Sequence, residues 1–561
     1  MTMTMTRNRW PFLAFLFISF LPSWVLAGQD KIATDLRVAD PTSIVDVIVQ
    51  FKELPTEADH GRIHEHGGKL KSELPTVKGA LYSVPVSALK GLSEDPQIVY
   101  ISPDRPVGAS LDLTTAAVNA PIAWTNYKLD GSGIGIAVID SGISAHPDLG
   151  RRVVYQQDFV GSGTGDQYGH GEHVAGIAAG NGMSSSCSTC TRTFKGLAPN
   201  ASLINLRVLD QNGQGTDSAV ILAIQQAINL KTKYKIRVMN LSLGRPVFES
   251  YQKDPLCQAA ESAWKSGIVV VVAAGNDGRN NSMGTYGYAT INAPGNDPYV
   301  ITVGAMKTEN TPQRTDDLIA SYSSKGPTLI DHVVKPDIVA PGNLVVSLMS
   351  PIGTLTSNSQ TLVPISYYEQ TTSTAKSTYY CRLSGTSMAA PVVSGAAALL
   401  LQENPSLTPD QLKARLMKTA YKGFPAFSTA TDPTTGVTYV DLYDIFTVGS
   451  GYLDIAAALA NADVATGNAL SPAATYNSTD GYVYLVSSSG AVWGTGAVWG
   501  TGAVWGTNVF VGSTGAVWGT GAVWGTNTDK GFGAVWGTGA VWGTSTEDTV
   551  GSTNIAITGE N

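Results

Sequence analysis

The stretch Ile134-Gly-Ile-Ala-Val-Ile-Asp140-Ser-Gly-Ile143 decides the fold. Its apolar residues are rich in β-branched side chains and do not alternate with polar ones, which is typical of a strand buried on both faces of a parallel sheet. Such sheets carry helices on both faces, so the stretch predicts a three-layer α/β/α domain with right-handed crossovers. Asp140 ends the strand, at the edge where open α/β sheets place their chemistry. A turn-forming aspartate is the alternative interpretation.

A histidine stands near the start of a second segment, Gly169-His170-Gly-Glu-His-Val-Ala-Gly176, which leads into a helix of small residues expected over 174–180. Glycines on both sides of His170 let its backbone approach other elements closely. The imidazole is therefore a candidate general base. His170 and His173 are three residues apart and could instead bind a metal, although no Cys or further His lies beside them.

A serine among small residues marks a third segment, Ser384-Gly-Thr-Ser387-Met-Ala-Ala-Pro391, which opens an apolar helical run. Pro391 is expected in the first helical turn, where a missing N–H is tolerated. The positive end of the helix dipole favours negative charge near Ser387. A capping serine on a packing helix is the alternative. Together the three segments supply a nucleophile, a base and an orienting carboxylate, which activation of a neutral hydroxyl requires.

An amide follows another buried strand in Val269-Val-Val-Val-Ala-Ala-Gly-Asn276-Asp-Gly278. A side-chain amide donates hydrogen bonds without carrying charge, so Asn276 suits an oxyanion that forms on a tetrahedral intermediate. Taken alone, the Asn-Asp-Gly sequence would be interpreted as a turn.

These motifs occur in the order Asp, His, Ser, and residues 112–462 resemble the subtilisin-like serine proteases. The resemblance implies that Asp140 orients and stabilises the imidazole of His170. It implies that His170 takes the proton from Ser387 and returns it to the leaving amine, while Ser387 forms the acyl-enzyme. By the same resemblance, Asn276 and the backbone N–H of Ser387 bind the oxyanion.

Two further residues of the histidine motif are interpreted through the resemblance. His173 is then a helix residue near the site and not the base. Glu172 departs from the family pattern, because many relatives carry Thr at this position. A carboxylate there would either raise the basicity of the histidine or face solvent.

Substrate recognition is also implied by the resemblance, which predicts an extended polypeptide as the partner. The segment Gly213-Gln214-Gly215 looks like an edge that pairs with such a chain, and Ser242-Leu243-Gly244 looks like another wall of the primary pocket. Asp277 would favour uncharged or basic side chains in that pocket. Asn292 is a further substrate-binding candidate, and Pro294 matches a position where relatives often carry a cis peptide.

Length and composition fit a large hydrolase with additional segments. The chain has 561 residues, of which 43% are hydrophobic, so more than one domain and a sizeable core are expected. The net charge of −8 is spread along the chain, and no basic tract indicates a nucleic-acid partner. No organic cofactor is implied.

The amino terminus predicts export. Arg7 and Arg9 precede an apolar stretch over 10–26, and the stretch ends in Val25-Leu-Ala27, the pattern of a cleaved signal peptide over 1–27. A retained anchor is the alternative, but three interruptions make the stretch marginal for spanning a bilayer. We therefore expect a secreted, extracellular protein without a stable membrane anchor.

Residues 28–110 alternate strand and helix patterns and are expected to form a small α+β unit. This unit looks like the inhibitory prodomain of many subtilisin-like proteases. The resemblance implies that it assists folding and acts as an intramolecular inhibitor until self-cleavage between about residues 103 and 113. An ordinary attached domain is the alternative.

Four cysteines in an exported chain favour disulfides over metal ligation. The sequence allows three pairings, and we prefer Cys187 with Cys190 and Cys257 with Cys381, because close neighbours need little loop closure. By the resemblance, the loop with the first pair is where some relatives bind calcium, and Asp148 matches one ligand position. Calcium is therefore a candidate cofactor.

The carboxyl-terminal part is repetitive. The hexapeptide Gly-Ala-Val-Trp-Gly-Thr occurs seven times between residues 490 and 544. We expect a peptidase domain over 111–462, a linker over 463–489, the repeats over 490–544 and a tail over 545–561. A short β-arch stack, a tail that binds glycans or surfaces, and a disordered low-complexity tail all fit the repeats.

The sequence therefore predicts a secreted serine endopeptidase that is made as a self-processed zymogen. Two alternatives belong to other classes of protein. One is a catalytically silent binding protein, against which the retention of Asp140, His170, Ser387 and Asn276 argues. The other is a surface-adhesion or glycan-binding protein that uses the tryptophan repeats and needs proteolysis only for maturation.

Overall fold

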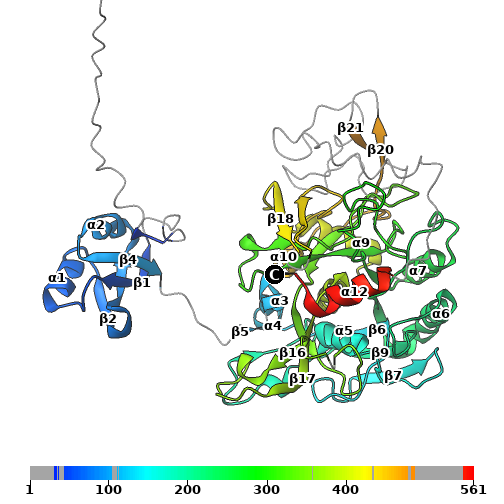
Figure 1. Cartoon of the computed structure of the whole chain (residues 1–561), viewed down its shortest axis with the longest axis horizontal. Coiled ribbons are helices and arrows are strands. Elements are labelled where there is room, and N and C mark those ends of the chain that lie inside the picture. The colour runs from blue at the N-terminus through cyan, green and yellow to red at the C-terminus, as the bar shows by residue number, and fades with distance from the viewer. Residues whose placement is uncertain are drawn as a thin grey trace, which may run out of the picture. The chain divides into compact units, whose positions relative to one another are not determined.

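In a computed structural model the chain forms two compact units, Met1–Gly108 and Ala109–Asn561. Figure 1 shows both units and labels their helices and strands where there is room. The structure describes residues 31–33, 36, 43–103, 110–111, 113–356, 358–432, 435–477, 482–486 and 547–560. The signal peptide expected over 1–27 and the repeats expected over 490–544 lie outside these ranges.

The described residues of the first unit form an antiparallel sheet with the strand order β2-β3-β1-β4, accompanied by two helices. Alternate residues of β1, among them Val47 and Val49, are buried and pack with Tyr82 of β3 and Ile63 of α1. The α+β pattern expected from the sequence is present. The elements are β1 (Ile44–Phe51), α1 (Glu57–Glu65), β2 (Lys69–Leu74), β3 (Gly79–Pro85), α2 (Leu89–Glu94) and β4 (Ile98–Pro103), with 3-10 turns at Pro75–Val77 and Val86–Ala88.

The second unit is built on a sheet with the order β13-β12-β11-β10-β6-β9-β7, and β14 pairs with β12. Neighbouring strands are parallel except for β13, which runs antiparallel to β12. Every residue of the interior strand β6 (Gly135–Asp140) is buried, as its apolar sequence predicts. The other strands are β7 (Val153–Asp158), β9 (Ser202–Arg207), β10 (Ile236–Leu241), β11 (Val269–Ala273), β12 (Ile301–Lys307), β13 (Leu318–Ile319) and β14 (Ile338–Pro341).

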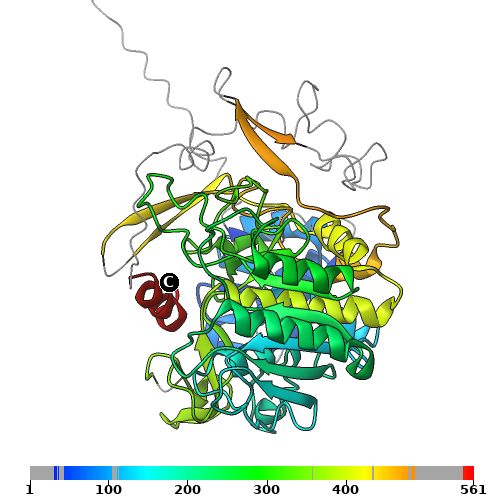
Figure 2. The ribbon, with the colours of Figure 1, turned by 90° about the vertical axis from the view of Figure 1, so that its right-hand side faces the viewer.

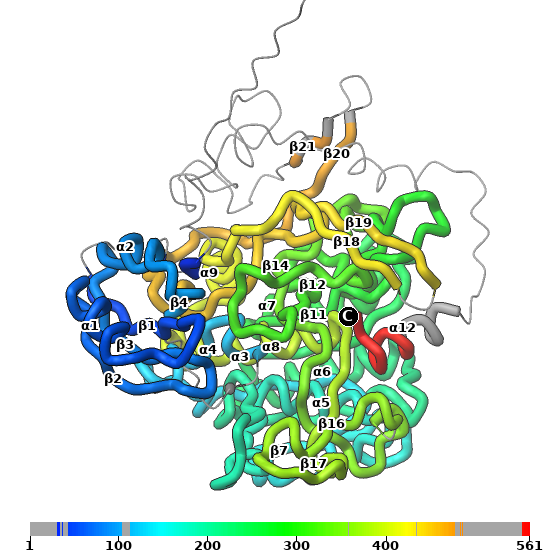
Figure 3. Tube along the Cα trace, turned by 60° about the vertical axis from the view of Figure 1, so that its left-hand side comes forward, coloured from blue at the N-terminus to red at the C-terminus, as the bar shows by residue number. Residues whose placement is uncertain are grey.

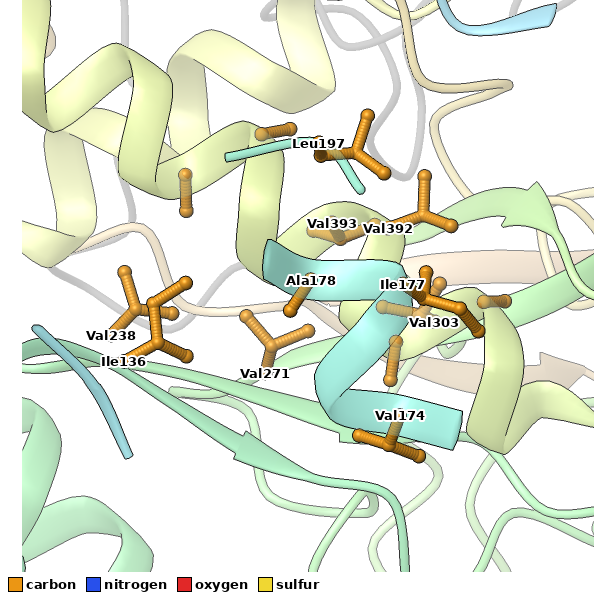
Figure 4. Close-up of a cluster of buried hydrophobic side chains, with 14 of the residues drawn as sticks. Ile136, Val174, Ile177, Ala178, Leu197, Val238, Val271, Val303, Val392 and Val393 are labelled. Carbon is orange, nitrogen blue, oxygen red and sulfur yellow. The ribbon is translucent and has the colours of Figure 1, made fainter. Parts of the chain in front are cut away.

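Helices cover both faces of this sheet, which confirms the predicted three-layer α/β/α fold. α5 (His170–Ala179) and α8 (Thr386–Glu403) pack together and against the central strands, while α6 (Asp217–Tyr234) and α7 (Pro255–Lys265) form another packed pair on the sheet. Figure 2 shows the helices lying along the sheet. Figure 4 shows Val174 and Ala178 of α5 and Val393 of α8 within the buried cluster that fills the space above the strands.

Smaller elements complete the second unit. The strands outside the main sheet are β5 (Ser110–Leu111), β8 (Arg192–Thr193), β15 (Val345–Leu348), β16 (Leu362–Pro364), β17 (Lys376–Leu383), β18 (Phe427–Thr431), β19 (Thr438–Leu442), β20 (Ala473–Asn477) and β21 (Tyr482–Val486). The remaining helices in the described ranges are α3 (Leu113–Ala117), α4 (Ala120–Thr125), α9 (Pro409–Thr419), α10 (Ile455–Ala460) and α12 (Glu547–Thr558), with 3-10 turns at Met183–Ser185, Arg314–Asp316 and Ile365–Tyr367. The antiparallel β20–β21 hairpin lies in the segment expected as a linker, and α12 lies in the segment expected as a tail.

The position of Pro391 in α8 corrects one prediction. The helix begins at Thr386, so Pro391 lies beyond the first turn, inside the helix. Proline has no N–H to donate to the carbonyl four residues earlier, which here belongs to Ser387. The hydroxyl of Ser242 donates to that carbonyl at 2.8 Å instead. The Ser242 hydroxyl thus replaces the hydrogen bond that the proline cannot make, which explains why proline is tolerated inside the helix.

The cysteines agree with the prediction in part. Cys187 and Cys190 form a disulfide, whereas Cys257 and Cys381 are free thiols, so the second predicted pairing is wrong. Cys257 lies in α7 and donates to the side-chain oxygen of Asn296, while Cys381 lies in β17 and donates to the carbonyl of Leu348. Each thiol is buried in a separate part of the core, where it packs as a small apolar side chain.

A membrane-spanning helix is not found within the described ranges, because none of the helices there is both long and apolar enough.

Candidate active site

A carboxylate and an imidazole meet where β6 ends and α5 begins. Nδ1 of His170 lies 2.8 Å from Oδ1 of Asp140, and both side chains are buried. The helix begins at His170 itself, four residues earlier than expected, because Gly169 takes a φ of +100° just before it. Burial opposes a charge on His170, but the neighbouring Asp140, with a smaller effect of Asp166, raises its pKa above the ordinary 6.5.

Asp166, which was not among the site residues predicted from the sequence, organises the turn before α5. Its carboxylate accepts the hydroxyl of Ser141 at 2.8 Å and the backbone N–H groups of Gly169 at 2.6 Å and Glu172 at 2.7 Å. The Ser141 hydroxyl in turn accepts the N–H of Gly171 at 2.9 Å. Two side chains thus hold the first turn of α5 against the end of β6. The N-cap residue of α5 is Gly169, three residues after Asp166, so the usual capping pattern does not indicate this role.

Ser387 lies in the first turn of α8 and is the only residue of Thr386-Ser387-Met388 that is not buried. Its hydroxyl donates to the carbonyl of Ser242 at 3.1 Å. Ser242 directly follows β10, whose residue Asn240 pairs with Val138 of β6. Because β10 and β6 are parallel neighbours, Ser387 is held at the same sheet edge as Asp140.

Asn276 follows β11 at this edge. Its side-chain oxygen accepts the backbone N–H of Thr386 at 2.9 Å. The amide nitrogen faces Gly385, where an added Cβ would lie 3.2 Å from it. Gly385 has a φ of +139°, so this position favours glycine for its backbone conformation as well. The amide oxygen is thus engaged by α8, and the NH₂ group is the end that can donate to a ligand.

The segment with Gly213, Gln214 and Gly215 forms a loop outside the sheet. Its shape is fixed by Asp210, whose carboxylate accepts the N–H of Gln214 at 2.9 Å and whose own N–H donates to the carbonyl of Gln214 at 2.8 Å. Gln214 and Gly215 are exposed. A Cβ at Gly213 would lie 2.7 Å from the ring of Tyr168, two residues before His170, so the loop borders the histidine motif.

The other substrate-binding candidates lie next to Ser387 and Asn276 in the structure or along the chain. Leu243 is partly exposed and Gly244 is exposed, directly after the Ser242 contact described above. A Cβ at Gly244 would lie 3.1 Å from Cβ of Asn292. The amide nitrogen of Asn292 lies 3.3 Å from a carboxylate oxygen of Asp277, so the predicted acidic group binds a neighbouring amide. The predicted cis peptide before Pro294 is confirmed.

Glu172 and His173 are both completely buried in α5. The carboxylate of Glu172 accepts the N–H of Ser144 at 2.5 Å, so it does not face solvent. Burial and the nearby charge of Asp166 raise its pKa well above the ordinary 4.5. Nε2 of His173 contacts the carbonyl of Val345 at 3.0 Å, and burial together with His170 lowers its pKa to about 3. His173 is therefore a core residue and does not share a ligand with His170.

The calcium-ligand candidate Asp148 is completely buried. Both carboxylate oxygens of Asp148 are engaged by donors, one by the Ser184 N–H at 2.7 Å and the other by the Tyr380 hydroxyl at 2.6 Å. Calcium needs several oxygen ligands that are free to converge on it. Within the described part of the chain, the one cluster of His, Cys, Asp and Glu atoms with metal-binding spacing is Cys187, Cys190 and Glu369. Its two sulfurs are already joined in the disulfide.

A three-layer α/β/α fold defines a class of serine peptidases when the carboxyl edge of its mostly parallel sheet carries a buried Asp–His pair and an accessible serine. Residues 131–444 match the Subtilase family, and the chain belongs to this family. It is a subtilisin-like serine endopeptidase that acts on polypeptides.

Several curated proteins are similar to this chain. Serine protease AprX of Bacillus subtilis (strain 168) is 38% identical over 387 residues, which cover 66% of this chain and 82% of the relative. Subtilisin E of the same strain is 34% identical over 384 residues, or 66% of this chain and 84% of the relative. Subtilisin DY of Bacillus licheniformis is 36% identical over 300 residues, or 52% of this chain and 85% of the relative.

Proposed function

We propose that this endopeptidase cleaves peptide bonds through Asp140, His170 and Ser387. The observation that carries the proposal is the 2.8 Å contact between Nδ1 of His170 and Asp140, at the sheet edge where Ser387 lies in the first turn of α8. With Nδ1–H held by a carboxylate, Nε2 is the ring nitrogen that can accept a proton.

In the proposed reaction, Nε2 of His170 takes the proton of the Ser387 hydroxyl while Oγ attacks the carbonyl carbon of the scissile bond. The Asn276 amide and the Ser387 N–H bind the oxyanion. His170 then gives its proton to the leaving amine, and an acyl-enzyme remains, which water hydrolyses by the same steps. In the free enzyme the hydroxyl donates to Ser242, and catalytic hydrogen bonds commonly form only with substrate in place.

The loop at Gly213, Gln214 and Gly215 and the segment Ser242, Leu243 and Gly244 are the proposed walls for an extended substrate. Both border a catalytic residue, the first through Tyr168 and the second through Ser387. Backbone groups in such walls bind almost any extended chain, so broad specificity is expected. Because Asp277 binds Asn292, these two residues would shape the pocket together.

Export and zymogen processing are part of the same proposal. A signal peptide over 1–27 would direct secretion, and residues 28–110 would act as an inhibitory prodomain. The separate compact fold of the first unit and its own buried core support a domain that can be released by cleavage.

The decisive experiment is Ser387→Ala. Loss of a nucleophile of this kind in a subtilisin lowers kcat by roughly 10⁶-fold. We expect no labelling by a fluorophosphonate and accumulation of the unprocessed precursor. The control Ser282→Ala changes an exposed serine and should keep both properties. Normal labelling of the Ser387→Ala protein would refute the assignment.

A further inference from the structure

The carboxyl-terminal segment is part of the folded peptidase unit. α12 packs against β17, and both Figure 1 and Figure 3 show it at the surface of this unit. The backbone N–H of Ser384 donates to the carbonyl of Ala556 at 3.0 Å, and Ile555 and Ile557 pack against the main core. Ser384 lies three residues before Ser387. The segment therefore docks on the residues that lead into the first turn of α8, which holds the proposed nucleophile.

The side chain of Glu560 is inserted into a cationic pocket and is only 3% exposed. One carboxylate oxygen contacts Arg279 at 2.8 Å and accepts the N–H of Ser321 at 2.9 Å, and the Ser321 hydroxyl also donates to it. The other oxygen lies 2.9 Å from Nζ of Lys307. Burial opposes ionisation, but Lys307, Ser321 and Arg279 outweigh it and lower the pKa of Glu560. A buried carboxylate is stable only with such partners.

The pocket also binds the backbone of Glu560 through hydrogen bonds. The side-chain amide of Asn343 accepts the Glu560 N–H at 2.9 Å and donates to the Glu560 carbonyl at 2.6 Å. Gly559 has a φ of +63°, and a Cβ there would lie 2.5 Å from Oγ of Ser384. The docked conformation thus requires a glycine followed by a glutamate.

The other end of the described segment reaches the histidine side of the site. The Thr553 side chain hydrogen-bonds with the hydroxyl of Tyr168. The ring of Tyr168 lies 6.3 Å from that of His170, measured between centroids. Residues 553–560 therefore run from the neighbourhood of His170 to the neighbourhood of Ser387.

We propose that this surface of the peptidase unit is a binding site for an acidic peptide containing Gly-Glu, filled in cis by residues 553–560. The docked segment then competes with the part of a long substrate that passes Ser384 and Tyr168. This second point rests on the proposed function. Docking also fixes both ends of the chain between residues 486 and 547 to one unit, because β20 is bridged to it through Ala473 and Val333.

The first test uses the full chain with Ser387→Ala, so that no variant digests itself. Hydrogen exchange is followed by mass spectrometry at the amides of Ser384 and Glu560. We expect Glu560→Gln to accelerate exchange at both amides at least tenfold. Gly559→Ala should also accelerate exchange at both amides, and it changes no residue of the pocket. It therefore tests docking even if Glu560→Gln disturbs the pocket.

The matched control is Glu309→Gln, which removes the other carboxylate that contacts Lys307, at 3.3 Å, without touching the segment. Its exchange should equal that of the parent chain. A fluorescent peptide with the sequence of residues 547–560 should bind the Glu560→Gln chain at least tenfold more tightly than a peptide with Gln at its Glu560 position. Equal binding of the two peptides, or equal exchange in all variants, would overturn the proposal.

Activity separates this proposal from the proposed function. With Ser387 intact, Gly559→Ala should raise kcat/KM on casein several-fold, since the docked segment no longer competes. If the catalytic assignment were wrong, loss of Ser387 would leave casein hydrolysis intact, whereas exchange and peptide binding would still report the docking. If exchange became faster but kcat/KM did not rise, the proposed competition with substrate would be wrong, whereas the proposed binding site for residues 553–560 would still stand.

Discussion

The side-chain oxygen of Asn276 accepts the backbone N–H of Thr386 at 2.9 Å, which ties the end of β11 to the first turn of α8. The two residues are 110 positions apart in the chain. This bond fixes the orientation of the amide, so that its NH₂ group and the N–H of Ser387 would donate to the same oxyanion. A hydrogen-bond donor that is held in place before the reaction stabilises the transition state more than one that must first reorganise.

Replacement of Asn276 by Ala should therefore lower kcat far more than it changes KM. Loss of a donor of this kind costs about 10²–10³ in kcat, a magnitude established in a subtilisin. Steady-state kinetics on a peptide p-nitroanilide measure both constants. Asn280→Ala, at an exposed position in the same loop, is the control and should leave both unchanged. An increase in KM that accounts for the whole loss would contradict the oxyanion role.

The pH dependence of kcat/KM should follow His170. A base must be neutral, so activity rises with pH through the pKa of the imidazole, which Asp140 holds above 6.5 against the effect of burial. Asp140→Asn should lower kcat by roughly 10⁴-fold, as for the equivalent carboxylate of a serine protease. It should also move the acid limb of the profile to lower pH. An unchanged acid limb in this variant would show that another group controls it.

The sequence revealed the parts of the site that are encoded locally. The apolar run before Asp140 and the small residues around Ser387 each determine a strand end or a helix start within about ten residues, so their element types could be predicted. The partners of these residues could not, because they come from distant segments. Ser242 is an example, because its hydroxyl compensates for Pro391 from 145 positions before Ser387.

Tertiary contacts also explain the wrong predictions. Nothing in the local sequence indicates that Cys257 and Cys381 contact different partners, Asn296 and Leu348. Nor does it indicate that Glu560 contacts Arg279 and Lys307. The pocket for Glu560 takes its residues from the ends of several strands, and these are brought together only by the sheet order.

The two free thiols should resist modification until the protein unfolds. Cys257 and Cys381 are fully buried, and burial raises the pKa of each, so neither presents a reactive thiolate. We expect no reaction of native Ser387→Ala protein with a disulfide reagent such as DTNB, and reaction of both thiols in denaturant. Prior reduction should add the thiols of Cys187 and Cys190. If unfolding alone released no thiol, the free state of Cys257 and Cys381 would be wrong.

The stability of the protein should depend on pH through Glu172. Its carboxyl has a folded-state pKa well above the ordinary 4.5, because burial and Asp166 disfavour the charge. A raised carboxyl pKa stabilises the fold fully below the unfolded-state pKa, and this contribution is lost as pH rises toward the folded-state pKa. Glu172→Gln removes the titration while keeping the shape of the side chain.

In the Ser387→Ala background, the free energy of unfolding of Glu172→Gln relative to its parent should therefore increase with pH. The limiting slope is about 1.4 kcal/mol per pH unit, beginning near pH 4.5. Urea titrations between pH 5 and 9 measure this slope, which is independent of any constant cost of placing an amide in the core. Glu249→Gln, at an exposed position, should track the parent at every pH. If the difference in unfolding free energy between Glu172→Gln and its parent did not change with pH, the Glu172 carboxyl would be charged in the folded protein. Burial and Asp166 would then not raise its pKa.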